Sequence, residues 1–491
     1  MLCITGAEGS LAAWERRVLT SDRRCLEAGL ALPLHELRLD ALDAIDDEVF
    51  ERLRERRKRT VVCCRPLSQG GHFRGPPNER IELLHRAAKA GPAWLDAEAE
   101  LGRNELLSLR ACLASGESEG RGKLMISWHE FGSFPADLGR RVRRLEALGG
   151  DVLKLAIQLE DTAEVGQLIA AFDGVMLPRV VIGMGAAGFV TRSHYRALGS
   201  LFTYVSASDE QATAPGQFNL ETAIQLGLPG SATTPIYGIV GGPQVLASPG
   251  LRVHNRFFRS RGLASSYVPI VTRTLAETLP VLESLGAVGL SVTMPLKLAA
   301  VSLCATDKLA DEVGAVNTLR YRKRWEGTNT DIEGVQRPLS VHVQALGLRR
   351  AVILGSGGAA RAALVACREL GLAVEIHARS LAAARSFSEG RATLEPWDMR
   401  GKNGTLADAA LVNTTPISGA ESPWPASAPS DAALVFDTAL GAPTSSLLER
   451  ARGSGAVVLG PLAMWFAQAA AQLNWWFDES VTAGELRELH R

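Results

Sequence analysis

Short apolar runs rich in β-branched residues recur through the first 206 residues, mostly separated by amphipathic stretches of helical length. Such runs predict strands, whereas apolar positions spaced by three or four residues predict helices. Strands are expected at 2–5, 36–39, 60–64, 93–98, 123–128, 151–157, 179–184 and 201–206. Helices among them are expected at 48–59, 79–90 and 134–148. Eight strands alternating with helices over about 200 residues predict an α/β fold, a closed (β/α)8 barrel.

The pattern changes after a cluster of Gly, Ser, Thr and Pro residues at 228–235, which predicts a linker. A new strand, IYGIVGG, begins at 236, and VILGSGGAARAA at 352–363 places a glycine turn between an apolar strand and an Ala-rich helix. That order is typical of a dinucleotide-binding Rossmann fold. We therefore expect a barrel at 1–231, an α/β substrate lobe at 232–335, and a Rossmann-type domain at 336–491 whose carboxyl-terminal helices return to the lobe.

Composition excludes several classes of protein. Lys plus Arg and Asp plus Glu both number 53, so no net charge favours nucleic acid or an anionic membrane, and we expect neither as a partner. The basic run at 52–59 has helical spacing and is interpreted as a solvated helix face. No apolar stretch reaches membrane-spanning length and the first residues lack a signal pattern, so a cytoplasmic location is expected. The seven scattered cysteines fit buried small side chains, and we assign no metal.

Lysine is rare in this chain, with eight lysines against 45 arginines. A Lys within an apolar strand is therefore informative, because a desolvated ammonium can lose its proton whereas a guanidinium cannot. Lys154 lies between Leu153 and Leu155, and we expect this setting to free its amine for attack on a carbonyl. His129, one strand earlier, could move protons, which together suggests loss of water β to a ketone. A solvent-facing Lys and a core His remain the alternatives.

Other polar residues fall where the predicted barrel strands end, the edge at which such barrels place their chemistry. They are Glu36, Arg38, Asp40, Arg65, Asp96, Glu98 and Arg192. A ring of this composition offers an amine nucleophile, a base, and arginines suited to a carboxylate and hydroxyls.

Several motifs of the first 225 residues occur together in the order of one known family. They are ELRLD at 36–40, CRPLSQGG at 64–71, DAE at 96–98, ISWHEF at 126–131, the strand around Lys154, GMGAAGFVTR at 183–192 and ATAPGQ at 212–217. In these the chain resembles the type I 3-dehydroquinate dehydratases. The resemblance implies that Lys154 forms a Schiff base, that His129 is the acid–base group and that Arg192 holds the substrate carboxylate. It further implies ring-hydroxyl contacts from Glu36, Arg38, Arg65, Thr213 and Gln217, with Thr5 a further candidate.

Two positions depart from that family pattern. Gln69 stands where the family usually has a Glu near the catalytic His, and Thr213 stands where it usually has Ser. The second change keeps a hydroxyl. The first removes a charge that would raise the basicity of the histidine, so we expect activity with a displaced pH profile.

The glycine turn of the second half has the features of a pyrophosphate site. Gly355, Ser356, Gly357, Gly358 and Ala359 lead into a helix whose amino terminus would supply N–H groups. The next strand ends in Arg379 and Ser380 rather than in an acidic residue. Arg suits a 2′-phosphate, which favours NADP over NAD unless Arg379 is simply one of the many arginines.

Three further motifs place small polar residues beside glycines, as expected for a pocket that holds a polyhydroxylated ring. They are SVTMPLK at 291–297, GAVNTL at 314–319 and GTNTDIEG at 327–334, and a later motif, NTTPI at 413–417, is similar to the loop beside the nicotinamide in a known family. Lys297 and Asp331 make a plausible proton-transfer pair. With these motifs, residues 235–491 resemble the shikimate dehydrogenases. The resemblance implies shikimate contacts from Ser248, Thr293, Asn317 and Gln468, and cofactor contacts that include Thr414 and Met464.

The two resemblances together imply a bifunctional lyase and oxidoreductase of the shikimate pathway, which leads to chorismate and the aromatic amino acids. Dehydrogenases of this family usually have a Ser where this chain has Leu246 and Ala247, and a Tyr where it has Leu440. Each lost hydrogen bond to a carboxylate could cost about 1.5–3 kcal/mol of binding. A second domain specific for quinate or a related hydroxy acid therefore stays open, as does a metabolite-sensing regulator without activity.

Overall fold

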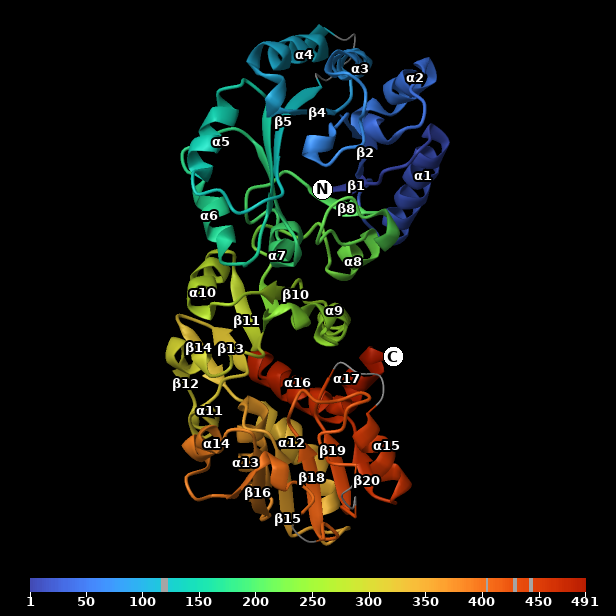
Figure 1. The fold of residues 1–491 in the computed structure, drawn as a ribbon. Helices are drawn as coiled ribbons and strands as arrows, with labels where there is room; N and C mark the ends of the chain where they lie inside the picture. The colour runs from blue at the N-terminus through green and yellow to red at the C-terminus, as the bar shows by residue number, and fades with distance from the viewer. Residues whose placement is uncertain (116–121, 403–404, 427–430, 441–444) are drawn as a thin grey trace. The chain divides into compact units, whose positions relative to one another are not determined.

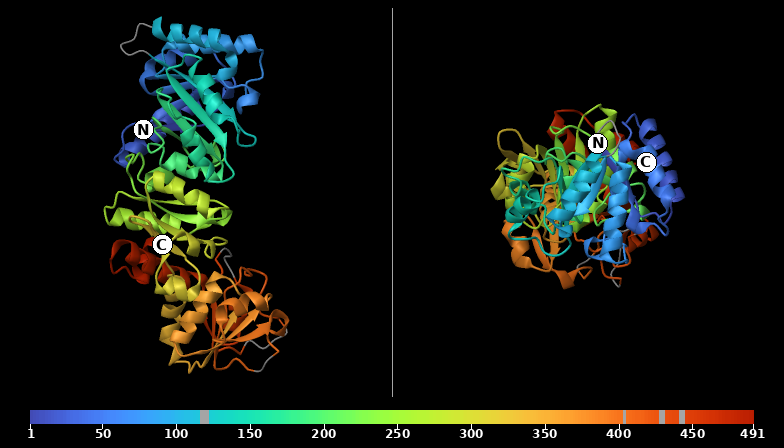
Figure 2. Two further views of the ribbon diagram at one scale, coloured as in Figure 1. Left: turned by 90° about the vertical axis from the view of Figure 1, so that its left-hand side faces the viewer. Right: turned by 90° about the horizontal axis from the view of Figure 1, so that it is seen from above.

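The computed structural model describes residues 1–115, 122–402, 405–426, 431–440 and 445–491. The chain divides into two compact units. The first comprises 1–237 with 258–287, and the second comprises 238–257 with 288–491. Figure 1 and Figure 2 give three views of the ribbon.

Eight parallel strands form the first unit's sheet, in the order β7-β6-β5-β4-β3-β2-β1-β8. They are β1 (Leu2–Thr5), β2 (Leu34–Arg38), β3 (Thr60–Cys63), β4 (Trp94–Glu98), β5 (Lys123–Glu130), β6 (Val152–Gln158), β7 (Arg179–Met184) and β8 (Thr203–Ser206). An isolated parallel bridge joins Arg179 of β7 to Ser200, just before β8. The predicted barrel is confirmed, and each of the eight strands lies within two residues of its predicted ends.

The helices that accompany these eight strands lie outside them (Figure 1). They are α1 (Leu11–Glu27), α2 (Asp47–Arg56), α3 (Pro77–Ala90), α4 (Arg103–Ser115), α5 (Leu138–Glu146), α6 (Glu164–Ala170), α7 (Phe189–Ser193) and α8 (Leu220–Gln225). Three begin at capping side chains, because Ser10 accepts from Ala13 N–H, Asp46 from Val49 N–H and Asn219 from Thr222 N–H. The helix predicted at 134–148 is shorter than expected, because it begins at Leu138 and ends at Glu146.

Alternation along the strands explains why the barrel is apolar at one level and polar at the next. A buried apolar cluster includes Cys3, Leu34, Val61, Trp94, Met125 and Val152, one from each of six strands. Two residues further along the same strands are Thr5, Glu36, Cys63, Asp96, Ser127 and Lys154, all buried. Because side chains two apart on a strand face the same side, the apolar layer supports a polar layer towards the carboxyl ends.

The loop after β6 is bound to residues that follow β10 or end it. The Thr162 N–H donates to the Val271 carbonyl at 3.0 Å, and the Thr162 hydroxyl lies 2.9 Å from both the Val271 and the Ala187 carbonyl oxygens. Asp161 accepts from the Thr272 hydroxyl at 2.7 Å and from the Arg273 N–H at 2.8 Å. All of these residues belong to the first unit, which explains why 258–287 group with the barrel.

Two further six-stranded sheets follow the barrel in the chain. A mixed sheet has the order β10-β9-β11-β13-β14-β12. Its strands are β9 (Ile236–Gly241), β10 (Ser266–Val271), β11 (Ala287–Val292), β12 (Ala305–Thr306), β13 (Thr318–Tyr321) and β14 (Trp325–Thr328). The helices in this part of the sequence are α9 (Gly250–Ser260), α10 (Leu275–Ser284), α11 (Lys308–Val313) and α12 (Asp331–Val343).

A fully parallel sheet of order β17-β16-β15-β18-β19-β20 forms the Rossmann-type part of the second unit. Its strands are β15 (Arg350–Leu354), β16 (Ala373–Ala378), β17 (Thr393–Pro396), β18 (Ala409–Asn413), β19 (Leu434–Asp437) and β20 (Val457–Leu459). Helices α13 (Gly358–Glu369), α14 (Leu381–Ser388), α15 (Ser446–Gly453), α16 (Pro461–Phe477) and α17 (Ala483–His490) complete it. From α16, Gln472 and Trp476 donate to the Thr318 hydroxyl and the Leu319 carbonyl of β13. No helix in the described residues has the length and hydropathy that crossing a membrane requires.

Candidate active sites

Lys154 lies inside the barrel on β6 and is 2 % exposed. Its Nζ donates to Asp96 Oδ2 at 2.6 Å and to the Tyr204 hydroxyl at 3.2 Å. The apolar setting expected from the sequence is wrong for the amine, because Leu153 and Leu155 alternate to the opposite side of the strand. Lys154 is instead held by a buried carboxylate and a phenol, so its Nζ has a fixed position inside the barrel.

Arg65 links the Lys154–Asp96 ion pair to a second buried carboxylate, that of Glu36. Its Nη2 donates to Asp96 Oδ2 at 3.2 Å and to Glu36 Oε1 at 3.0 Å. Although burial opposes it, the charges of Lys154 and Arg65 hold the pKa of Asp96 well below its usual range. Arg65, Lys154 and Arg38 likewise keep the pKa of Glu36 low against its burial. Both carboxylates are therefore charged at neutral pH.

The loop after β8 closes over this network. The Thr5 hydroxyl donates to Glu36 and lies 3.4 Å from the Thr213 hydroxyl. Gln217 Oε1 accepts from the Thr213 N–H at 2.7 Å and from its hydroxyl at 3.2 Å. At Gly216, where φ is +70°, a Cβ would lie 2.2 Å from the Gly185 carbonyl oxygen, so only glycine permits this close approach.

His129, on β5, is buried and contacts Gln69. Its backbone N–H and its Nδ1 both lie 3.1 Å from Gln69 Oε1. Burial, followed by the charges of Arg65 and Lys154, lowers the pKa of His129 well below its usual value. The imidazole is therefore neutral at pH 7 and can accept a proton.

Arg192, in α7, is 1 % exposed. Its Nε and Nη2 are buried and have no hydrogen-bond partner among the described residues. Burial lowers the pKa of Arg192 to about 10. A buried guanidinium without a carboxylate partner is costly, and an anionic ligand would satisfy it. Arg38, by contrast, is already paired with Asp40 Oδ2 at 2.6 Å.

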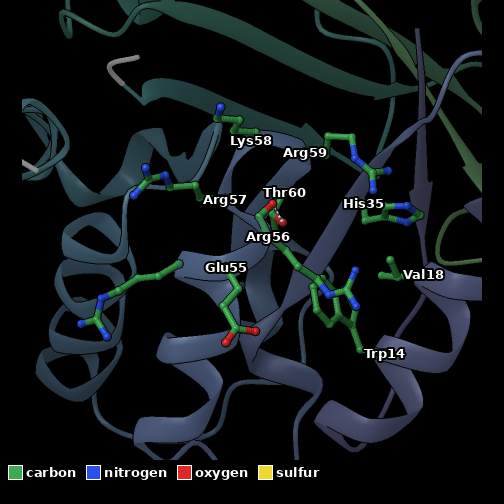
Figure 3. Close-up of a pocket in the computed structure, with 10 residues that line it drawn as sticks. Trp14, Val18, His35, Glu55, Arg56, Arg57, Lys58, Arg59 and Thr60 are labelled. Carbon is green, nitrogen blue, oxygen red and sulfur yellow. Dashed lines mark hydrogen bonds between the residues drawn. The ribbon is translucent and has the colours of Figure 1, made fainter. Parts of the chain in front are cut away.

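The basic run at 52–59 lies elsewhere, beside a cavity of about 420 Å³ (Figure 3). The cavity is next to His35 and Thr60, at the amino-terminal ends of β2 and β3, whereas the polar ring lies towards the carboxyl ends. Arg59 Nη2 and His35 Nε2 both bind the Asp22 carboxylate at 2.8 Å. In Figure 3 the side chains of Arg56 and Arg57 point in different directions, so the run does not converge on one point.

A second cluster lies in the second unit, around Asp331 at the start of α12. Lys297 Nζ donates to Asp331 Oδ2 at 2.5 Å, and Asn317 Nδ2 donates to Asp331 Oδ1 at 2.8 Å. The Thr330 hydroxyl joins Asn317, at 3.0 Å, to Gln468 Oε1, at 3.4 Å. Four of the residues expected at this site are therefore connected by hydrogen bonds.

The glycine turn after β15 lies beside this cluster. Gly355 has φ of +120°, and a Cβ there would lie 2.7 Å from the Thr414 hydroxyl. At Gly357, the N-cap of α13, a Cβ would meet nothing within 4 Å, so the backbone faces open space. A Cβ on Gly358 would lie 3.2 Å from Lys297 Cδ. The turn thus fits a pyrophosphate at the helix amino terminus, adjacent to the lysine.

The other residues expected to contact the cofactor differ in exposure, since some are exposed and one is buried. Arg379 is exposed after β16, and the Ser380 hydroxyl caps α14 by accepting from Ala383 N–H at 3.2 Å. Met464 is buried on α16, with its Cγ 3.1 Å from the place of a Cβ on Gly334. Within the described residues, no group of three His, Cys, Asp or Glu side chains is placed to hold a metal ion.

Comparisons with known proteins match each half of the chain to a different family. The family model described as type I 3-dehydroquinase matches residues 20–226, and the shikimate dehydrogenase substrate binding domain matches 240–319. The NADP(+) shikimate dehydrogenase of Trichormus variabilis is 34% identical over 268 residues, covering 50% of this chain and 92% of that protein. The chain belongs to the shikimate dehydrogenase family. Its first half matches the type I 3-dehydroquinases.

Two relatives span both halves of the chain. The chloroplastic bifunctional 3-dehydroquinate dehydratase/shikimate dehydrogenase of Arabidopsis thaliana is 29% identical over 487 residues, covering 91% of this chain and 77% of that protein. The solved dehydroquinate dehydratase and shikimate dehydrogenase of S. pombe AroM covers 100% of this chain and 98% of its own, with 20% identity and a TM-score of 0.44.

The shikimate dehydrogenase half lacks hydroxyl groups at the positions identified in the sequence. Leu246 and Leu440 are 44% and 49% exposed, and neither carries a polar side-chain atom. Ser248 keeps its hydroxyl, which accepts from the Gly250 N–H at 3.2 Å. Thr293 is held through its N–H by the Val240 carbonyl at 3.0 Å, beside the loop that carries Lys297.

Sequence reasoning missed two residues of the 3-dehydroquinase half. The sequence indicates Tyr204 only as part of an apolar strand, although its inward position on β8 is two residues from buried Phe202. Glu100 carries no sequence signal at all, because its contact with Gln69 depends on how two loops meet.

Proposed function

We propose that this chain catalyses two consecutive reactions, the dehydration of 3-dehydroquinate in the barrel and the NADPH-dependent reduction of the 3-dehydroshikimate formed. The main support is the barrel, which holds Lys154 and neutral His129 inside and carries on α7 a buried guanidinium, Arg192, that lacks an anionic partner among the described residues. We also propose the domain boundaries near 231 and 335 inferred from the sequence.

In the dehydratase, the substrate carboxylate would bind Arg192, and Glu36, Arg38, Arg65, Thr213 and Gln217 would contact the ring hydroxyls. Lys154 Nζ then attacks the ketone carbon, and the carbonyl oxygen leaves as water to give an iminium. The proton that Nζ loses leaves with the carbonyl oxygen in that water, and Asp96 Oδ2, at 2.6 Å, holds Nζ in position.

His129 removes a proton from the carbon next to the iminium, and the electron pair moves towards nitrogen. The pair returns as the C–O bond to the β-hydroxyl breaks, and the proton on His129 leaves with that oxygen as water. Addition of one water to the iminium releases 3-dehydroshikimate and free Lys154, so the net change is loss of one water.

In the dehydrogenase, the turn Gly355–Ala359 would hold the pyrophosphate of NADP, with Arg379 at the 2′-phosphate and Thr414 and Met464 along the cofactor. When bound, NADPH supplies the hydride for reduction of the ketone. Lys297 and Asp331, joined at 2.5 Å, would donate the proton that the new alkoxide oxygen requires. Ser248, Thr293, Asn317 and Gln468 would bind the substrate around this pair.

A coupled assay tests both activities at once. With 3-dehydroquinate and NADPH as the only reactants, loss of NADPH absorbance requires both sites, and we expect it. No loss of absorbance with 3-dehydroquinate, when 3-dehydroshikimate itself is reduced, would refute the dehydratase.

Quinate is a second candidate substrate for the dehydrogenase half, because Leu246, Ala247 and Leu440 remove hydroxyl groups from the carboxylate pocket. Steady-state oxidation of shikimate and quinate with NADP decides between them. A larger kcat/KM for quinate would favour this alternative.

A further inference from the structure

Gln69 lies between the acid–base histidine and a second carboxylate, Glu100. Its Oε1 accepts from His129 N–H and Nδ1, both at 3.1 Å, while its Nε2 donates to Glu100 Oε1 at 2.7 Å. Gln69 is buried in the short helix Leu67–Gln69, whereas Glu100 is exposed and follows β4. The three side chains form a continuous line from the solvent to the imidazole.

The chemistry of the two ends leaves Gln69 only one orientation. A backbone N–H can only donate and a carboxylate can only accept, so the amide oxygen must face His129 and the amide nitrogen must face Glu100. Since Oε1 can only accept, Nδ1 of the neutral imidazole must carry the hydrogen. Nε2 then keeps its lone pair, which is the form that a base requires.

The backbone of the loop that carries Gln69 is closely packed. A Cβ on Gly71 would lie 1.9 Å from the Arg65 carbonyl oxygen, and Gly70 has φ of +70°. Glu100, for its part, makes no ion pair in the part of the chain that the structure describes, and Gln69 is the partner of its carboxylate. The contact is therefore not a by-product of another salt bridge.

Type I dehydratases usually have a Glu at the position of Gln69. We propose that Glu100 is a positioning residue of the dehydratase, which acts through Gln69 to hold His129 with hydrogen on Nδ1 and Nε2 free for the substrate proton. The inference rests on the proposed dehydration. It implies that the carboxylate of this chain lies one side chain further from the histidine than the family's Glu does. It also implies that the dehydratase stays active when Gln and Glu are exchanged between positions 69 and 100.

Two replacements of Glu100 test the acceptor role, with the rise of enone absorbance from 3-dehydroquinate as the readout. Glu100→Leu removes the acceptor, and we expect kcat to fall roughly tenfold, less than the ~100-fold or more expected for loss of the acid–base group. Glu100→Gln can still accept from Gln69, so it should recover most of that loss. Glu51→Leu, at an exposed glutamate of α2, is the matched control for the surface change.

Exchanging the two residues tests the pair more sharply. Gln69→Glu alone would place two carboxylates about where Gln69 and Glu100 now lie 2.7 Å apart, and we expect kcat at pH 8 to fall roughly tenfold. Adding Glu100→Gln removes the repulsion, so the double variant should recover to within about threefold of the parent. Its acidic limb should lie at higher pH, because a carboxylate next to Nδ1 favours imidazolium.

Thermal unfolding of all four variants separates positioning from folding, since a variant that retains its Tm but loses kcat is folded. Unchanged kcat in Glu100→Leu, or a double variant no better than Gln69→Glu alone, would overturn the inference while the dehydratase itself stands. A parent chain that does not dehydrate 3-dehydroquinate would instead refute the proposed function.

Discussion

The imidazole of His129 shares its surroundings with several cations, and this has a direct effect on pH dependence. Burial and the nearby charges of Arg65 and Lys154 both lower its pKa, and only Asp96 opposes them strongly enough to be among the main causes. A lowered pKa means that the neutral, proton-accepting form persists as the pH falls.

We therefore expect the acidic limb of the dehydratase kcat/KM profile to lie below pH 6.5, the usual value for histidine. Initial rates between pH 4.5 and 8.5 measure it, because kcat/KM reports groups of the free enzyme. A limb centred above pH 6.5 would contradict the structure.

A second prediction concerns the covalent adduct expected at Lys154. Borohydride reduction in the presence of 3-dehydroquinate should attach the substrate to the intact chain, and mass spectrometry should locate it at Lys154. Lys154→Ala should abolish the adduct and lower the dehydratase rate by ~1,000-fold or more, since the covalent route is lost. An adduct that survives this replacement would assign the Schiff base to another lysine.

A third prediction concerns the binding of the substrate carboxylate by Arg192. Replacing it with Ala should lower kcat/KM of the dehydratase about 10- to 100-fold, because a hydrogen bond to a charged carboxylate contributes about 1.5–3 kcal/mol. Arg196→Ala removes an exposed arginine of the same region and is the matched control. Equal effects of the two replacements would show that Arg192 does not bind the carboxylate.

The sequence was sufficient to predict which polar residues lie inside the barrel. The physical reason is that side chains alternate between the two sides of a strand. Glu36, Asp96 and Lys154 stand at inward positions of strands whose limits follow from composition alone. Tyr204 could not be separated from core aromatics, because only the structure shows its hydroxyl 3.2 Å from Nζ. Glu100 is 31 positions from Gln69, and no local pattern predicts such a loop–loop contact.

At the level of elements, the turn between β15 and α13 depends on a backbone conformation that side chains rarely adopt. Gly355 has φ of +120°, and any Cβ would collide with the Thr414 hydroxyl. The sequence predicted the glycine turn, but it could not predict the residue with which a larger side chain would collide.

Gly355→Ala should therefore weaken NADP binding and lower the dehydrogenase rate by tenfold or more, since the strain alone costs about 1–3 kcal/mol. The dehydratase should keep its rate. Gly453→Ala, where a Cβ meets nothing within 4 Å, is the matched control. Dehydrogenase kinetics at saturating NADPH and calorimetric titration with NADP measure the effect, and unchanged affinity would count against it.

At the level of the whole molecule, the boundary inferred from the sequence does not coincide with the division of the chain into compact units. The Gly- and Pro-rich stretch at 228–235 correctly precedes a new strand, β9, yet 258–287 group with the barrel. Composition detects where a chain turns; it does not detect which later segment binds back. Several of the hydrogen bonds that hold this segment come from Asp161 and Thr162, residues that no motif contains.

A fragment comprising 1–231 should consequently be less stable than the barrel of the full chain. It leaves the Thr162 N–H without the Val271 carbonyl, whereas the Thr162 hydroxyl keeps the Ala187 carbonyl, and an unsatisfied buried N–H costs about 1–3 kcal/mol. We expect loss of dehydratase activity on heating at a temperature lower by about 5 °C or more. Identical inactivation temperatures would show that these hydrogen bonds do not stabilise the barrel.

The return of 258–287 to the barrel also bears on how a gene for this chain could divide. A break at 232–257 would leave that segment on the polypeptide of the second enzyme, although it packs with the first. Separation of the two halves at that point would therefore remove the partners of Asp161 and Thr162, and the loop after β6 of a separate barrel would need other partners for these groups.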